Sequence, residues 1–303
     1  MTLLQRLAAF SALGMFLLLI SGALVTTTGS EDGCGTAWPN CDGDWSTLAT
    51  WIEVNHRVIT GVLGLAILTL SVLAWRQLGG RREIRRLIIL AIVLLLLQSW
   101  LGAVAVMWGS SDAVMAGHFG VSLASFGSVF LLALRIRQLE TGRTYRNGPV
   151  PPRFRGLLWA NFVLLAAVVY LGAYLRHAEI GLACLGWPLC NNALIPAWGT
   201  PEFTNMAHRV LAGALAFLTA VTGHLTRPYR AERPDLFWGS AAAVALVVLQ
   251  ALSGWLVVGT LGSVAANVLH SSWVTLYTGA LLFLMWQATP ETMSAREPRR
   301  AAV

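Results

Sequence analysis

Four histidines recur at matched spacing and are the residues of this chain best suited to chemistry. His56 opens the segment His-Arg-Val-Ile-Thr-Gly, and His208 opens the similar segment His-Arg-Val-Leu-Ala-Gly 152 residues later. His118 and His270 follow these two histidines by 62 residues each. Neutral imidazole is a frequent axial ligand of haem iron. The spacing therefore predicts two sites, each with a pair of histidines able to hold a haem.

The composition predicts an all-α integral membrane protein. The chain has 303 residues, of which 12% are charged, and its mean hydropathy is +0.65. Soluble domains carry about 25% charged residues. Apolar runs of about 20 residues match the thickness of a bilayer and favour helices over barrel strands. We expect eight transmembrane helices, at 7–27, 51–75, 86–107, 113–136, 155–176, 203–225, 236–258 and 263–288.

The basic residues predict how the chain is oriented. All 21 are arginine, and 18 of them fall in the N-terminus, the loops near 76–86, 135–155 and 227–233, and the C-terminal tail. Cytoplasmic loops collect positive charge, so both termini are expected in the cytoplasm of a cell-membrane protein. The arginines lie in short loops between helices, which argues against a nucleic-acid partner for this basic chain.

Repeated residues beyond the histidines predict two four-helix halves. Gln98 and Gly102 recur at the same offset of 152 residues as Gln250 and Gly254. Because each half has an even number of helices, the copies form tandem four-helix bundles related by a pseudo-twofold axis along the membrane normal. The expected division is an N-terminal half over 1–140, a cytoplasmic linker over 141–154, a C-terminal half over 155–290 and a cytoplasmic tail over 291–303.

The expected helices place the paired histidines at one depth, toward the outer face of the membrane. Ligands at equal depth on different helices are how bundles hold a cofactor in their core. A lone histidine at such an interface is more often only hydrogen-bonded, but four at matched depth and spacing favour ligation. His177 and His224 have no histidine at the corresponding position of the other half, and we assign both a structural role.

Two further repeated pairs have more than one interpretation. Arg57 and Arg209 each follow a histidine at the membrane edge, where a guanidinium group could bind haem propionates or simply reach the interface. Gln98 and Gln250 lie in apolar stretches, and we favour hydrogen bonds between helices for both.

One residue distinguishes the halves. Glu53 lies three residues before His56, close to its helix face, whereas Asn205 holds the same place before His208. An acid near a helix N-terminus is favoured by the helix dipole alone. An ionisable group beside a presumed ligand is also expected where one haem site reacts and the other supports it. Glu53 could relay protons or stabilise a developing positive charge.

The four cysteines fall in two outer loops. Since the outer side is oxidising, we expect disulfides Cys34–Cys41 and Cys184–Cys190. Zinc is a poor alternative because the short zinc-ligand spacings are absent. A redox-active role for the pair Cys34 and Cys41 stays open.

Taken together, these residues resemble the haem A synthase family, whose members convert haem O to haem A in the membrane. The resemblance covers about residues 7–288 and rests on Glu53-Val54-Asn55-His56-Arg57, His118, His208-Arg209, His270 and the four cysteines. It implies a haem b cofactor, with its iron, at His208 and His270. It also implies that haem O is oxidised at its C8 methyl group, through successive hydroxylations to a formyl group, beside the catalytic residues His56, His118 and Glu53.

The resemblance also bears on partners and alternatives. It implies haem O delivered by a haem O synthase and an electron-transfer partner that the sequence does not identify, and it leaves a homo-oligomer open. The alternative is a dihaem b-type electron-transfer protein, which would favour haems at opposite membrane faces and would not need Glu53 in one half only. A transporter built from parallel repeats would leave the matched histidines unexplained.

Overall fold

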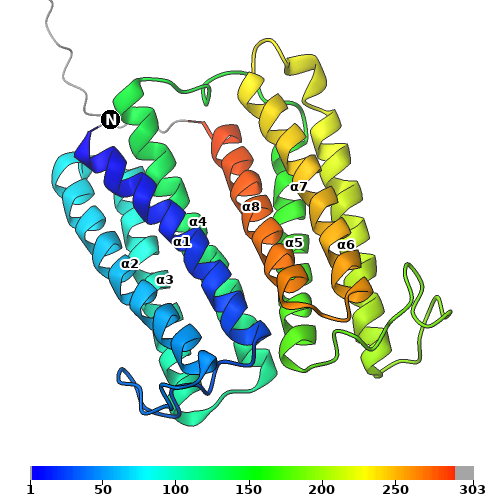
Figure 1. Cartoon of the computed structure of the whole chain (residues 1–303). Helices are drawn as coiled ribbons and strands as arrows, with labels where there is room; N and C mark the ends of the chain where they lie inside the picture. The colour runs from blue at the N-terminus through cyan, green and yellow to red at the C-terminus, as the bar shows by residue number, and fades with distance from the viewer. Residues whose placement is uncertain (1, 291–303) are drawn as a thin grey trace, which may run out of the picture.

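The protein is all-helical in the computed structural model, which describes residues 2–290. Eight long helices and one short 3-10 helix make up this part of the chain, with no strand (Figure 1). The helices are α1 (Leu3–Thr27), α2 (Leu48–Leu78), α3 (Arg82–Trp108), α4 (Asp112–Thr141), α5 (Phe154–His177), α6 (Pro201–His224), η1 (Arg227–Tyr229), α7 (Pro234–Gly259) and α8 (Val264–Ala288). The expected tail 291–303 lies outside the described residues.

The eight long helices are each apolar and long enough to cross a membrane, which confirms the predicted class of multi-pass membrane protein. Backbone polar groups have no water to bind inside a bilayer, so a continuous helix satisfies them internally. Several helices extend beyond the predicted spans, because polar residues at their ends still satisfy helical hydrogen bonds outside the apolar run. The clearest cases are α2, predicted over 51–75, and α4, predicted over 113–136.

The helices form two groups that lie side by side in Figure 1, with α1 to α4 in one and α5 to α8 in the other. Helix α1 packs against α8, and α4 packs against α5, so these four helices make the boundary between the groups. A single buried apolar cluster continues across this boundary, from Met15 and Phe126 on one side to Leu165 and Leu281 on the other. The pseudo-twofold relation and the division into domains stay predictions.

The helices that carry the paired histidines all begin at the same end of the molecule, beside the two cysteine loops. We call this the loop end and the opposite end the terminal end. At each start a serine or threonine hydroxyl accepts a hydrogen bond from the backbone N–H three residues later. This bond gives a partner to one of the N–H groups that the first turn of a helix leaves free. The capping residues are Thr47, Ser111, Thr200 and Ser263.

These caps set the depth of the histidines. Each histidine follows the cap of its own helix by seven to nine residues. At 1.5 Å per residue, all four therefore lie about 10 to 14 Å along their helices from the loop end.

At the terminal end, the segment between the two groups is held by a buried arginine. The guanidinium group of Arg146 donates to both carboxylate oxygens of Glu83, at 3.2 and 3.0 Å, and lies 4.2 Å from the ring of Trp286. Glu83 lies in the first turn of α3, whereas Trp286 lies in α8. The expected linker 141–154 is thus a structured connection between both groups of helices.

Three arginines also cap the end of α8. Its last carbonyl groups have no partner within the helix, as at any helix C-terminus. Arg233 donates to Gln287 O at 2.8 Å, and Arg155 donates to Ala288 O at 2.7 Å. Arg146 donates to Thr289 O at 2.9 Å. Positive charge at this end of a helix is also favoured by the helix dipole.

We expect Arg146→Ala to destabilise the protein strongly, because it removes a buried guanidinium group that pairs with Glu83 and binds the carbonyl groups of Thr289 and Pro290. Breaking a buried ion pair costs about 3 to 5 kcal/mol. Thermal unfolding of the detergent-purified protein measures the effect. Arg137→Ala removes an exposed arginine of α4 and serves as the control. Equal unfolding temperatures for the two variants would contradict the role given to Arg146.

Candidate functional site

Each of the four paired histidines packs against a glycine of the preceding helix. A Cβ atom added at these glycines would lie 2.8 to 3.5 Å from Cε1 of the imidazole. The pairs are Gly22 with His56, Gly102 with His118, Gly172 with His208 and Gly254 with His270. The missing side chain lets each imidazole lie directly on the neighbouring helix, where a larger residue would displace it.

The histidines come together in the predicted pairs. His56 of α2 interacts electrostatically with His118 of α4, and His208 of α6 interacts in the same way with His270 of α8. Within residues 2–290, no group of three or more His, Cys, Asp and Glu side chains is placed to hold a bare metal ion. A haem needs only one or two axial protein ligands, because the porphyrin supplies the others.

The surroundings of the imidazoles fit axial ligation of a haem. A ligating histidine usually donates its second ring N–H to a nearby acceptor, which fixes the ring. Nδ1 of His56 lies 3.3 Å from Ser21 Oγ, and Nδ1 of His270 lies 2.9 Å from Ser253 Oγ. The buried Nδ1 atom of His118 has no hydrogen-bond partner within the described structure. Buried polar atoms of this kind are uncommon and indicate a site prepared for a bound group.

Gln250 also contacts the second pair. Its side-chain nitrogen lies 3.0 Å from Nε2 of His270, which agrees with the interhelical hydrogen bond favoured from the sequence. The same nitrogen atom of His270 would be needed by an iron. A haem at this site therefore requires Gln250 to turn aside, and its buried Oε1 has no partner that would hold it in place.

The carboxylate of Glu53 is buried and fully engaged. It accepts a hydrogen bond from the backbone N–H of Cys34 at 2.8 Å and from Nε of Arg57 at 3.1 Å, and it also pairs with Nη2 of Arg57. Only 3% of Glu53 is exposed. Glu53 therefore connects α2 to the first cysteine loop one helical turn from His56. Asn205, in the same place in α6, instead donates to the carbonyl of Gly181 at 2.7 Å.

Arg57 and Arg209 hold the cysteine loops. Arg57 Nη1 donates to the carbonyls of Ala37 and Asn40 at 2.8 and 2.6 Å. Arg209 donates to several carbonyls of the second loop, including that of Cys184 at 2.6 Å. The sequence did not reveal these contacts, because the loop carbonyls lie about twenty residues away. Propionate binding by the two arginines stays a prediction.

The structure contains the disulfides Cys34–Cys41 and Cys184–Cys190. Cys34 and Cys184 are fully buried against the starts of the histidine-bearing helices. Both loops also contain a cis Trp-Pro bond, at Trp38-Pro39 and at Trp187-Pro188. The two loops are therefore similar in covalent structure and in the arginine that binds them.

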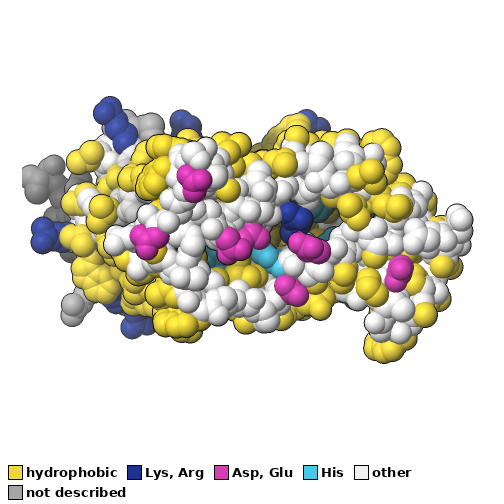
Figure 2. All heavy atoms as spheres, turned by 60° about the horizontal axis from the view of Figure 1, so that its bottom comes forward, with side chains coloured by type: hydrophobic (Ala, Val, Ile, Leu, Met, Phe, Trp, Pro, Cys, Tyr) yellow, Lys and Arg dark blue, Asp and Glu magenta, His cyan; other side chains and the backbone are white. Residues whose placement is uncertain are grey.

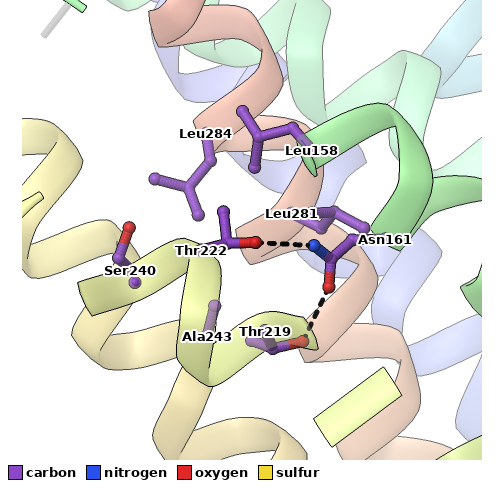
Figure 3. Close-up of a pocket in the computed structure, with 9 residues that line it drawn as sticks. Leu158, Asn161, Thr219, Thr222, Ser240, Ala243, Leu281 and Leu284 are labelled. Atoms are coloured by element: carbon purple, nitrogen blue, oxygen red, sulfur yellow. Dashed lines mark hydrogen bonds between the residues drawn. The ribbon is translucent and has the colours of Figure 1, made fainter. Parts of the chain in front are cut away.

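A buried polar cluster crosses the second group of helices closer to the terminal end (Figure 3). Asn161 of α5 donates to Thr222 Oγ1 and accepts from Thr219 Oγ1, both at 2.9 Å, and Thr219 also meets the hydroxyl of Tyr277. Hydrogen bonds between membrane helices contribute about 0.6 kcal/mol each on average. The cluster therefore braces α5, α6 and α8 below the second histidine pair.

One histidine that we assigned a structural role lies closer to the site than its sequence position suggested. His177, at the end of α5, interacts electrostatically with His118 and with Asp112 of α4. The sequence carries no signal for this interaction, because it joins the two groups of helices.

The fold and the site together define a multi-pass helical membrane protein with two half-buried histidine pairs near one end. Residues 44–205 match the family model described as cytochrome oxidase assembly protein, COX15-CtaA. The chain is 36% identical to the haem A synthases of Geobacillus kaustophilus (strain HTA426) and Geobacillus thermodenitrificans, over 99% of this chain and 95% of each relative. It is 35% identical to the haem A synthase of Bacillus cereus (strain 03BB102), over 96% of this chain and 95% of that protein. The chain belongs to the haem A synthase family.

We expect Gly172→Ala to reduce the haem retained by the purified protein about tenfold, since overpacking by one methyl group costs about 1 to 3 kcal/mol. The new Cβ would lie 2.8 Å from a ring atom of His208, and neither the ring nor the helix backbone can yield easily. Gly213→Ala is the matched control, because a Cβ there meets nothing within 4 Å. The haem content per chain measures both. Equal losses in the two variants would contradict a specific role for the contact.

Proposed function

We propose that this chain converts haem O to haem A by oxidising the C8 methyl group of haem O to a formyl group, through successive hydroxylations. The substrate binds in the N-terminal half, and a haem b stays bound in the C-terminal half. Membership of the haem A synthase family supports the overall conversion. The assignment of the halves rests on one observation: both hold a half-buried histidine pair, but within the described residues only the first has a buried carboxylate one turn from a histidine.

In the N-terminal half, His56 and His118 are proposed to hold the substrate haem from opposite helices. Their packing against Gly22 and Gly102 limits how the rings can turn, and so orients the bound porphyrin. The carboxylate of Glu53, paired with Arg57, lies one turn from His56 and, through Cys34, holds the first cysteine loop. A negative charge near the substrate would stabilise positive charge that develops during its oxidation.

In the C-terminal half, His208 and His270 are proposed to ligate the iron of haem b. When bound, this group supplies one-electron transfer. The braced helices below it favour a resident cofactor over an exchangeable one, because Asn161 and its partners fix the spacing of α5, α6 and α8.

The proposed orientation in the membrane follows from the positions of the helix ends and the arginines. Helix α1 begins, α8 ends and the arginine-rich connections lie at the terminal end, so the rule for positive charge favours this end in the cytoplasm and the histidine pairs toward the outer face. Haem O would come from a haem O synthase, and an electron-transfer partner would complete the reaction. The dihaem electron-transfer alternative is disfavoured, since both histidine pairs lie at the same end of their helices.

We expect His208→Ala and His270→Ala to remove the absorbance of a low-spin b-type haem from the purified protein. Each substitution deletes one of the two proposed axial ligands. An absorption spectrum of the reduced protein reports the result, with His224→Ala as the control because that residue lies at the other end of α6. An unchanged spectrum in both ligand variants would rule out the assignment.

We expect Glu53→Gln to lower haem A formation at least tenfold while haem b is retained, which corresponds to about 1.4 kcal/mol on the barrier. Glutamine can still accept the hydrogen bond from Cys34 N–H, so the substitution removes the charge with little change of shape. Chromatography of haems from cells that also make haem O measures the product.

His56→Ala and His118→Ala should also stop product formation and leave haem b in place. Asn205→Glu should not transfer activity to the other half. Normal haem A formation by Glu53→Gln would show that the charge serves only the loop.

A further inference from the structure

Arg176 lies between the two groups of helices at the loop end. It is in the last turn of α5, four residues after Gly172, which packs on His208. Its Nη2 donates to the backbone carbonyl of Thr26 in α1 at 2.6 Å. Thr26 in turn lies four residues after Gly22, which packs on His56. The side chain of Arg176 therefore connects α5, which packs on the second histidine pair, to α1, which packs on the first.

The guanidinium group of Arg176 has an unused donor. Its Nε is buried and has no hydrogen-bond partner within residues 2–290, and no carboxylate in that range forms a salt bridge with it. Leaving a buried polar donor unsatisfied costs about 1 to 3 kcal/mol, more for a charged group. Arg57, by contrast, uses Nε, Nη1 and Nη2 in contacts with Glu53 and its loop. Arg176 is thus the arginine at this end whose buried donor still needs an acceptor.

The neighbours of Arg176 place this donor beside the proposed haem sites. His177, the next residue, interacts electrostatically with Arg176 and Asp112, and His118 interacts with His177. Viewed from the loop end, histidine and arginine side chains lie in a hollow near the middle of the surface, between acidic side chains (Figure 2). Because Arg176 follows Gly172 by one turn and binds Thr26 of α1, a bound group that extends from either histidine pair toward the loop end would meet its guanidinium group.

We propose that Arg176 binds a propionate carboxylate of a bound haem at the boundary between the two halves. This inference rests on the proposed function, in which the chain binds two haems. It assigns propionate binding to a third arginine, in place of Arg57 and Arg209. A guanidinium group matches a carboxylate with two parallel hydrogen bonds, and a buried charged acceptor would satisfy Nε. The carboxylate comes either from the substrate haem or from haem b, since Arg176 lies one turn after Gly172 and binds Thr26, which lies one turn after Gly22.

The experiment uses the full-length protein, purified with its haem b and titrated with haem O. The variants are Arg176→Gln, which removes the charge, and Arg176→Lys, which keeps the charge but loses the paired donors. Arg155→Gln is the matched control, because Arg155 lies on the same helix and also donates to a carbonyl of another helix, at the opposite end. The measurements are the apparent Kd for haem O and the midpoint potential of haem b.

We expect Arg176→Gln to affect one haem and Arg155→Gln to affect neither. If the carboxylate belongs to the substrate, the apparent Kd for haem O rises about tenfold, equal to about 1.4 kcal/mol, and the haem b potential is unchanged. If it belongs to haem b, the midpoint potential falls, because a positive charge that favours the reduced form is lost. Arg176→Lys should give an intermediate value.

Wild-type behaviour of both haems in Arg176→Gln would overturn the proposal, as would an equal change in Arg155→Gln. Should Arg176→Gln fail to fold, the same two measurements on Arg176→Lys test the proposal. The proposed function is tested independently of this proposal: it is wrong if the wild-type protein binds haem but forms no haem A.

Discussion

The close contact between each paired histidine and a glycine of the preceding helix is the constraint on which the site depends. An imidazole buried in a helix bundle needs space that is usually filled by a neighbouring side chain. At four places the neighbouring residue is a glycine, which has no Cβ atom. The ring therefore lies on the backbone of the preceding helix. The tightest case, Gly172 with His208, leaves no room for even one methyl group. Ring position is therefore set by helix packing rather than by flexible side chains.

The two ends of the molecule complete this arrangement in different ways. At the loop end, hydroxyl caps start the four histidine-bearing helices at similar levels, and Arg57 and Arg209 fasten the disulfide loops above them. At the terminal end, Arg146 and Arg233 are buried and bind the free carbonyls of α8. The helix that carries His270 is thus fixed at both ends, which limits its sliding or rotation. Such rigidity suits an iron ligand, because ligation requires that both histidines keep their separation.

The sequence predicted the helices and the histidine pairs, since both depend on local pattern. Apolar runs indicate a membrane span, and the repeated spacing of 62 residues predicts the histidine pairs, whose role as ligands stays a prediction. The recurrence of Gly102 as Gly254 was visible as well, but its meaning was not, because the glycine contact joins different helices. The hydrogen bond of Arg146 with Glu83 and the electrostatic interaction of His177 with His118 join residues 63 and 59 positions apart. No local propensity encodes such contacts; they follow from how the helices pack.

The central claim is that each half holds one haem, with different roles for the two. The most direct measurement is the number and type of haems extracted per chain from the full-length protein, made in cells that also produce haem O. The account predicts two haems per chain, one of them haem b and the other haem O or haem A. A double substitution of His56 and His118 by alanine should leave only the haem b. A single haem per chain in the wild-type protein, or loss of haem b from that double variant, would contradict it.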